Sequence, residues 1–155
     1  MSSSSYAVPV MKVAARWVDL AGRAVEVHVF LHAGSEYGLR AETLAARLDH
    51  PEARFLPCEI EGQRQLLNLD AVTYLELGGT LPEVEEMRAV GASSCAVELD
   101  LASGETLRGQ LLYEAPAGAH RLSDLLNAPS GGFLLLTGDG LTRFVNRRAI
   151  LRARG

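Results

Sequence analysis

One pattern occurs twice in this chain and constrains its fold more than any other feature. The pattern L-x-x-x-L-[DN]-x-P-x-x-x-F-L is present at residues 44–56 and again at 122–134, so Phe55 and Phe133 stand 78 positions apart (133 minus 55). The same spacing relates further pairs downstream without a gap: Glu61-Gly62 with Asp139-Gly140, Asn68 with Asn146, Ala71 with Ala149, and Val72 with Ile150. A repeat of this kind indicates two copies of one structural unit.

The composition between the copies suggests where they divide. Residues 78–94 contain two consecutive glycines, a proline and an acidic cluster, which are typical of a linker. We therefore expect a first unit at 1–77, an acidic linker at 78–94 and a second unit at 95–155. A unit of about 70 residues buries only about 60% of its unfolded surface. The two copies are accordingly expected to share an interface.

Hydrophobic periodicity predicts a mainly β fold with short helices. Each copy reads strand, strand, short helix, strand, hairpin, strand, strand. The helices are expected at 40–48 and 122–126, where proline prevents their continuation. The expected strands are 13–20, 24–31, 55–60, 65–69 and 71–77 in the first copy, and 97–101, 106–113, 133–136, 144–146 and 150–153 in the second. Five short antiparallel strands with a bent second strand predict a small, partly open barrel, because closing a sheet removes exposed edges.

The second copy resembles a known fold. Residues 97–111 resemble the opening of the Sm-like fold, with a strand, a turn ending near glycine and an L-x-G-x-L strand, and residues 144–151 are similar to its closing part. The resemblance covers about residues 96–154 and, more faintly, 13–77. It implies a barrel of Sm or SH3 type in each copy. Sm-like proteins carry their helix before the first strand, whereas this chain places it between strands two and three, and no function is carried over from the fold.

The residues that the two copies share are interpreted as structural. They supply apolar anchors, helix stops, the first residue of a strand and polar turn positions: Leu48, Pro51, Phe55, Asn68, Leu126, Pro129, Phe133 and Asn146. Asp49 and Asn127, the shared polar pair at the helix end, are expected to bond to nearby backbone. Phe55 and Phe133 are expected to be equivalent core residues, each costing about 3–5 kcal/mol on replacement by alanine.

No group of residues has a catalytic or metal-binding signature. Cys58 and Cys95 lie outside any C-x-x-C spacing and are expected to be buried thiols. His28 and His32 would lie about 13 Å apart along a strand, too far to share one metal ion. The glycine pairs match neither a dinucleotide-binding nor a P-loop motif. We therefore predict a chain that is not an enzyme and needs no cofactor or metal.

Five arginines near the C-terminal end form the one candidate binding group: Arg143, Arg147, Arg148, Arg152 and Arg154. As a nucleic-acid footprint they would have to share a face, and the net charge of −4 disfavours such a partner. Alternatively they protect a strand edge by charge, or pair with the linker acids Glu83, Glu85 and Glu86.

These observations leave three hypotheses for function. The first is a non-enzymatic protein-interaction or assembly module that binds a partner or itself through strand edges or the groove between the copies. The second is Sm-like nucleic-acid binding through the arginines, and the third is a small-molecule sensor with its pocket between the copies. No apolar run reaches the roughly 20 residues of a membrane helix. The first five residues lack the features of a secretory signal, so a cytoplasmic location is expected.

Overall fold

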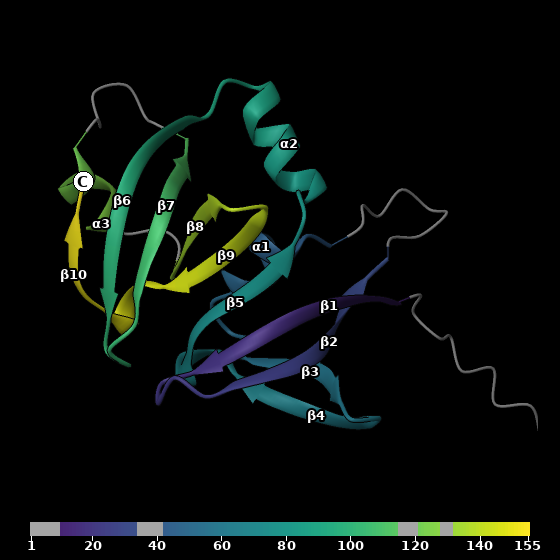
Figure 1. Ribbon diagram of the computed structural model, residues 1–155. Helices are drawn as coiled ribbons and strands as arrows, with labels where there is room; N and C mark the ends of the chain where they lie inside the picture. Colours follow the sequence, from purple (N-terminus) through teal and green to yellow (C-terminus); the bar gives the residue numbers. More distant parts are fainter. Residues whose placement is uncertain (1–9, 34–41, 115–120, 128–131) are drawn as a thin grey trace, which may run out of the picture.

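A single antiparallel sheet of ten strands organises the molecule (Figure 1). The computed structural model describes residues 10–33, 42–114, 121–127 and 132–155. The strand order across the sheet is β10-β6-β7-β8-β9-β5-β1-β2-β3-β4. The strands are β1 (Val10–Asp19), β2 (Ala24–His32), β3 (Phe55–Ile60), β4 (Gln63–Asn68), β5 (Val72–Gly78), β6 (Ser93–Leu101), β7 (Thr106–Tyr113), β8 (Phe133–Gly138), β9 (Leu141–Asn146) and β10 (Ile150–Arg154).

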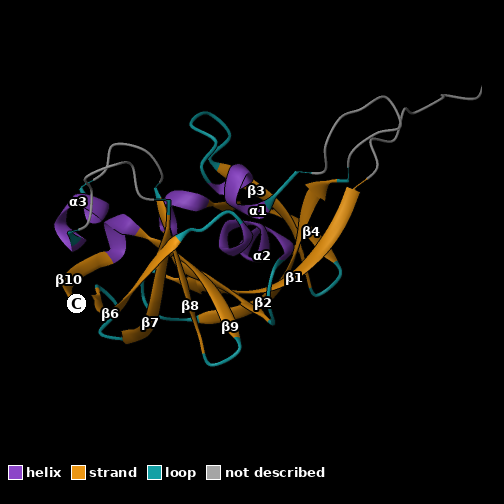
Figure 2. Cartoon of the chain, turned by 90° about the horizontal axis from the view of Figure 1, so that it is seen from above, coloured by secondary structure: helices purple, strands orange, loops and turns teal. Residues whose placement is uncertain are grey.

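The helices are short. They are α1 (Leu44–Leu48), α2 (Pro82–Ala89) and α3 (Leu122–Leu126), with 3-10 turns η1 (Leu69–Ala71) and η2 (Arg147–Ala149). α1 and α2 lie close together when the molecule is seen from above, whereas α3 lies near β10 (Figure 2). The backbone N–H of Ala45 in α1 donates to Glu83 Oε2 in α2 at 3.1 Å, which joins the two helices. None of the described helices is long and apolar enough to cross a membrane.

The same order of elements occurs twice along the described chain. We call residues 10–78 the first half and residues 93–155 the second half. From α1 onward, each element of the first half begins 78 residues before its counterpart in the second, as with β3 at Phe55 and β8 at Phe133. The hairpin turns also match, since Glu61 and Asp139 both have a φ of 52°. Positions 78 apart in this part of the chain are therefore called counterparts.

The sequence-based prediction of a mainly β fold with short helices is confirmed. Each expected strand lies within or overlaps an observed one, and β3, β7 and α3 have the expected bounds. The segment 78–94, expected as a linker, contains α2 and the start of β6. One open sheet runs through both halves, because β5 pairs with β9. The partly open barrel form of each unit stays a prediction.

The hydrophobic core consists of two clusters that exchange residues where the halves meet. Phe144 from the second half belongs to the cluster formed by the first half. Val18 and Tyr74 from the first half belong to the cluster formed by the second. These residues are at most 2% exposed, so each half completes the core of the other.

The expectation that Phe55 is a core residue is wrong. Its side chain is 55% exposed, while Phe133 is half-buried against the first cluster. Successive side chains of a strand point to opposite faces, and in β3 it is Leu56 and Cys58 that point inward, both 0% exposed. The expected burial of Leu48 and Cys58 is confirmed, whereas Cys95 is only partly buried. Pro129 lies outside the described residues.

Candidate protein-interaction edges

The two halves are joined by pairing between β5 and β9, which we call the central junction. Its antiparallel register places Leu75 opposite Phe144 and Glu76 opposite Arg143. Arg143 Nε donates to Glu76 Oε2 at 2.8 Å, with both side chains about one-seventh exposed. Charge pairing, strand pairing and shared core therefore all hold this junction.

Two of the repeated polar positions contribute contacts across the central junction. Asn146 Nδ2 donates to Val72 O at 2.8 Å, while its Oδ1 accepts from the Arg148 N–H at 3.1 Å. The Asp49 carboxylate accepts from the backbone N–H groups of Gly132 and Phe133, although burial raises the pKa of this carboxyl overall. Sequence reasoning expected only local turn contacts at these positions, so their role in joining the halves was missed.

The sheet ends at β4 on one side and at β10 on the other, and we call these strands the outer edges. Within the described residues, no strand pairs with the outer side of either. Large apolar side chains are exposed along them: Leu66 in β4 is 66% exposed and Leu151 in β10 is 73% exposed. An open edge is a template for pairing with another chain, so these strands are candidate binding elements.

The hydrogen-bond pattern of β4 shows which of its backbone groups are open. The Leu69 N–H donates to Arg54 O at 2.8 Å, in line with the β3–β4 register. Because hydrogen-bonded pairs alternate along an antiparallel ladder, Leu67 and Gln65 direct their backbone groups toward β3. Leu66 therefore directs its N–H and C=O outward, where an added strand would meet them.

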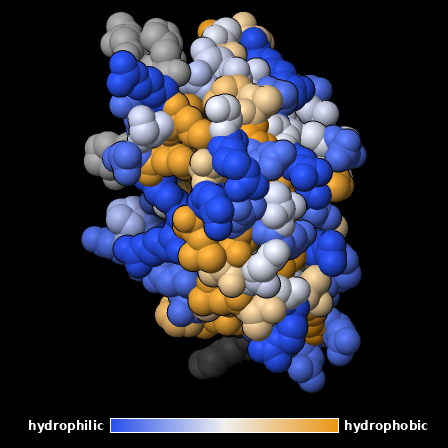
Figure 3. Space-filling model, turned by 60° about the vertical axis from the view of Figure 1, so that its left-hand side comes forward, coloured by the Kyte–Doolittle hydropathy of each residue, from blue (hydrophilic) through white to orange (hydrophobic). Residues whose placement is uncertain are grey.

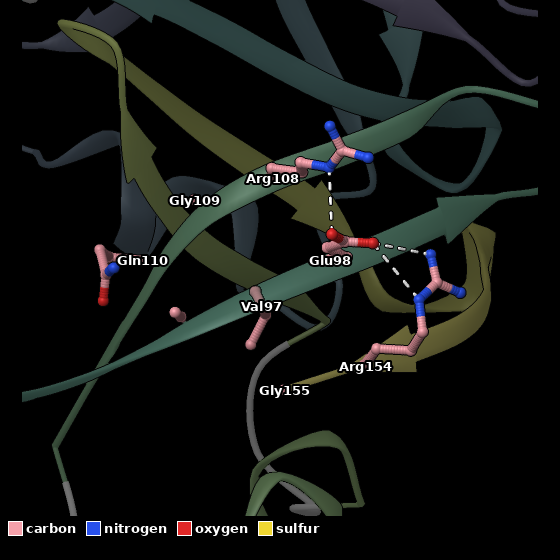
Figure 4. Close-up of a pocket in the computed structure, with 8 residues that line it drawn as sticks. Val97, Glu98, Arg108, Gly109, Gln110, Arg154 and Gly155 are labelled. Carbon is pink, nitrogen blue, oxygen red and sulfur yellow. Dashed lines mark hydrogen bonds and ion pairs between the residues drawn. The ribbon is translucent and has the colours of Figure 1, made fainter.

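A surface hollow lies beside each outer edge. The one at β10 has a volume of about 590 Å³ (Figure 4), and its lining is Ala96, Val97, Glu98, Arg108, Gly109, Gln110, Arg154 and Gly155. The one at β4 has a volume of about 500 Å³, and its lining is Phe30, Pro57, Cys58, Arg64, Gln65 and Leu66. The Arg64 guanidinium lies 5.2 Å from the centre of the Phe30 ring. The β4 hollow thus borders an open strand, whereas most of the lining of the other hollow comes from β6 and β7, with Arg154 at the end of β10.

Acidic neighbours neutralise the charges on β10. Arg154 Nη1 lies 2.6 Å from Asp100 Oδ2, and its Nη2 lies 3.0 Å from Glu98 Oε2. Hydrogen bonding from Arg154 lowers the pKa of Asp100 to about 2 and also lowers the pKa of Glu98. Arg152 Nε lies 3.5 Å from Asp100. On the side of the molecule that carries β6 and β10, apolar and hydrophilic patches lie next to one another (Figure 3).

The structure separates the five arginines that the sequence grouped. Arg143 belongs to the central junction, and Arg152 and Arg154 belong to β10. Arg147 Nη2 donates to Leu125 O at 3.5 Å, and Arg148 is exposed. The acids that pair with Arg143, Arg152 and Arg154 are Glu76, Glu98 and Asp100, rather than the α2 acids expected from the sequence.

A groove of about 320 Å³ lies beside the central junction. Residues from both halves line it: Asp49, Pro51, Arg54, Asp70, Gly132, Asn146, Arg147 and Arg148. Arg54 Nη2 lies 3.1 Å from Asp70 Oδ1, and Arg54 Nη1 donates to Leu48 O at 2.8 Å, which satisfies a carbonyl at the end of α1. Among the residues that the structure describes, no group of three or more His, Cys, Asp or Glu could hold a metal ion.

No family model, curated protein or solved structure matches this chain.

The outer-edge residues Leu66 and Leu151 are functional candidates that sequence reasoning missed. Both lie within strands, where an apolar residue is ordinarily assigned to the core. The sequence offered one signal: Leu66 and its counterpart Phe144 are both apolar, which indicates an apolar contact at this strand position in each half. That signal becomes readable only when the strand order shows β4 at an end of the sheet and β9 inside it.

Proposed function

We propose that this chain is a non-enzymatic protein-interaction module, built from two copies of a small barrel-like unit, that binds a partner chain at the outer edges β4 and β10. The binding mode is strand addition: main-chain hydrogen bonds to the open edge give affinity, and side chains entering the neighbouring hollows give specificity.

The contrast in burial between counterparts carries this proposal. Leu66 is 66% exposed, whereas its counterpart Phe144 is 2% exposed at the central junction. Leu151 is 73% exposed, whereas its counterpart Thr73 is 0% exposed. The same strand positions are thus covered where a neighbouring strand is present and uncovered where the sheet ends. Apolar side chains at uncovered edge positions are typical of surfaces that bind another protein.

The charges on the outer edges are compatible with such binding. Edge strands that avoid pairing commonly carry unpaired lysines or inward-pointing charges. On β10, however, Arg152 and Arg154 are held by Asp100 and Glu98 on the neighbouring β6. An incoming strand would meet an approximately neutral surface there.

Site-specific photo-crosslinking in cells tests the proposal. A photoreactive amino acid replaces Gln65 on β4 or Leu151 on β10, and the control replaces Val90, which is apolar and 75% exposed but lies at the end of α2 rather than on an outer edge. We expect discrete crosslinked protein products from the two edge positions and none from the control. Equal or absent products at all three positions would overturn the proposal.

A second candidate function is binding of a small anionic molecule in the groove beside the central junction. The observation that favours it is that the groove draws lining arginines from both halves: Arg54, Arg147 and Arg148. Thermal-shift screening tests it, since a ligand at about 100 times its Kd adds roughly 2.7 kcal/mol of stability. The expected shift should fall in the Arg148→Ala variant, because Arg148 is exposed and its loss leaves the fold intact. No shift with any anionic metabolite removes this candidate.

Nucleic-acid binding is the alternative with the least support, because the five arginines do not share a surface. Gel-shift titration with single-stranded RNA at two salt concentrations tests it, and no binding at low salt excludes it.

A further inference from the structure

We infer that the partner at the outer edges is a second copy of this chain, with β10 of one copy adding to β4 of the next in the register of the central junction. This inference rests on the proposed function and names its partner. The central junction is formed by β5 and β9, and their counterparts 78 residues away are β10 and β4. The two strands left open are therefore the counterparts of the two strands that already pair.

The register of the inferred contact is obtained by replacing each residue of the central junction by its counterpart. Leu75 lies opposite Phe144 and Glu76 lies opposite Arg143 at the central junction. Their counterparts are Ala153 opposite Leu66, and Arg154 opposite Gln65. The Gly79 N–H donates to Gly140 O at 2.9 Å, and alternation along the ladder makes Leu75 and Phe144 a hydrogen-bonded pair. Leu66, which directs its backbone groups outward, fits the corresponding position.

Apolar side chains of β4 would pack against the second cluster beside Ala153 of β10. At the central junction, Phe144 and the partly buried Phe133 and Leu135 pack on the first cluster. Their counterparts are Leu66, Phe55 and Pro57, which are all exposed at the β4 edge and in contact with solvent. These side chains lack the cover that the second half gives to the corresponding side chains inside the molecule.

The receiving surface has smaller residues where the central junction has larger ones. Leu75 and Leu77 of β5 are buried in the first cluster, and their counterparts are Ala153 on β10 and Gly155 directly after it. Gly155 lines the 590 Å³ hollow, near Val97 and Gly109. Ala153 is only partly buried on the second cluster, whereas Leu75 is 0% exposed, so apolar surface stays uncovered beside Ala153, opposite which Leu66 of a second copy would lie.

The repeated polar positions supply the remaining contacts. Asn146 donates to Val72 O across the central junction while its Oδ1 caps η2. Asn68 caps η1 with its Oδ1 in the same way. Its Nδ2 would then donate to Ile150 O of a second copy. This second bond explains why asparagine occurs at both positions, since capping alone requires only an acceptor.

A charged residue lies at the same position of the two contacts, but the acid Glu76 on β5 is replaced by the base Arg154 on β10. At the central junction, Glu76 lies between Arg16 on β1 and Arg143 on β9. On β10, Arg154 binds Glu98 on β6, and the residue brought opposite it would be Gln65. The Gln65 carbonyl oxygen can accept from the guanidinium, so the contact places no like charges together.

A second copy fits better than an unrelated protein because both edges are explained at once. An unrelated partner would account for one edge and leave the apolar side chains of the other uncovered. A second copy covers Leu66 with one contact and, by the same contact in the next copy, covers β10.

Disulfide crosslinking tests the register. Gln65→Cys with Arg154→Cys is prepared in a background in which Cys58 and Cys95 are alanine, because opposed residues on antiparallel strands have Cα atoms about 4.5–5.5 Å apart, within disulfide range. The matched control pairs Gln65→Cys with Ala153→Cys, which a one-residue displacement places on opposite faces. We expect intermolecular disulfides between positions 65 and 154 under mild oxidation and at least tenfold fewer in the control. Equal yields would overturn the inference.

Asn68→Asp gives a second test that does not depend on cysteine chemistry. The new side chain keeps the Oδ1 acceptor that caps η1 but replaces the Nδ2 donor by an oxygen facing Ile150 O of the second copy. We expect self-association, measured by sedimentation velocity, to weaken at least fivefold while the unfolding midpoint of the dilute protein changes little. Unchanged self-association, or a wild-type chain that remains monomeric at millimolar concentration, would overturn the inference.

The two proposals fail separately. Photo-crosslinks from Gln65 and Leu151 to other proteins, with no crosslink to the chain itself, would refute the second copy as partner and leave edge binding intact. Absence of any edge crosslink beyond the Val90 control would refute both.

Discussion

The replacement of Phe144 by alanine should destabilise the whole molecule and not just its second half. Phe144 is 2% exposed and lies in the first cluster, although it belongs to the second half of the chain. Truncating a buried phenylalanine costs about 3–5 kcal/mol, because transfer free energy is lost and a cavity remains. With an urea m value of about 2 kcal/mol/M, the unfolding midpoint should fall by roughly 1.5–2.5 M.

The counterpart position provides the matched control. Leu66 is 66% exposed, so only about a third of its side-chain burial can be lost on truncation. Full burial of a leucine is worth about 1.5–3 kcal/mol, and Leu66→Ala should therefore cost about 0.5–1 kcal/mol. Unfolding is followed by circular dichroism and by Trp17 fluorescence at a concentration where sedimentation velocity shows the protein to be monomeric. A loss below about 1 kcal/mol for Phe144→Ala, or equal losses at the two positions, would refute the reasoning.

The number of transitions tests the interleaved core in the same experiment. Trp17 is buried in the first cluster and reports on the first half. Because Phe144 and Tyr74 each complete the other half's core, both probes should report one transition in the wild type. A fluorescence midpoint that stays unchanged in Phe144→Ala while the dichroism midpoint falls would show that the halves unfold independently.

Three further predictions address single features. Asn146→Asp should cost about 2–3 kcal/mol at neutral pH by removing the donor to Val72 O, and part of this loss should be recovered in acid as the introduced carboxyl gains a proton, which urea titration at two pH values measures. The Asp100 carboxyl should titrate near pH 2 when its pKa is followed by carbon NMR. Because its folded pKa lies below the ordinary 3.8, its stabilising contribution is present above pH 3.8 and is lost as the pH falls toward 2. Arg154→Gln should move the titration midpoint up toward 3.8, and an unmoved midpoint would contradict the assigned cause. Gly109→Ala should cost about 1–3 kcal/mol, because the added Cβ would lie 2.5 Å from the backbone oxygen of Thr137, whereas Gly104→Ala, with open space at its Cβ but a φ of +93°, separates crowding from backbone strain in the same unfolding assay.

The elements of this fold are readable from local sequence because the signals are local. Pro51 prevents the continuation of α1, the Glu61-Gly62 and Asp139-Gly140 pairs supply positive φ for hairpins, and apolar alternation places β2 and β6. The strand order, in contrast, depends on contacts between residues that are distant in sequence. Nothing near β5 or β9 in the sequence states that these strands pair, since the residues in contact are about 70 positions apart.

The burial of particular residues could not be predicted for the same reason. Phe55 and Phe133 occupy the same position of the repeated pattern, yet one is 55% exposed and the other is partly covered. Only the position of their strands in the sheet distinguishes them: β8 is followed by β9 and then by the first half, whereas β3 is followed by β4 and then by the end of the sheet. The acidic partners of the arginines likewise come from β5 and β6 rather than from the expected group Glu83, Glu85 and Glu86.

The geometry of the central junction limits how further copies can assemble. The junction joins different strands of its two sides, β5 from one half and β9 from the other, so it is a head-to-tail contact rather than a two-fold symmetric one. A symmetric dimer would use the same edge twice and leave the other edge open. Repeating a head-to-tail contact instead either closes into a ring with a fixed number of chains or continues as an open filament, depending on whether the rotation per contact closes the circle. Light scattering distinguishes these outcomes, because a ring gives one mass that is independent of concentration once formed, and a filament gives a mass that rises with concentration. In either case Asn68→Asp should reduce the assembled fraction, while a two-fold dimer insensitive to Asn68 would contradict the translation of the central junction to the outer edges.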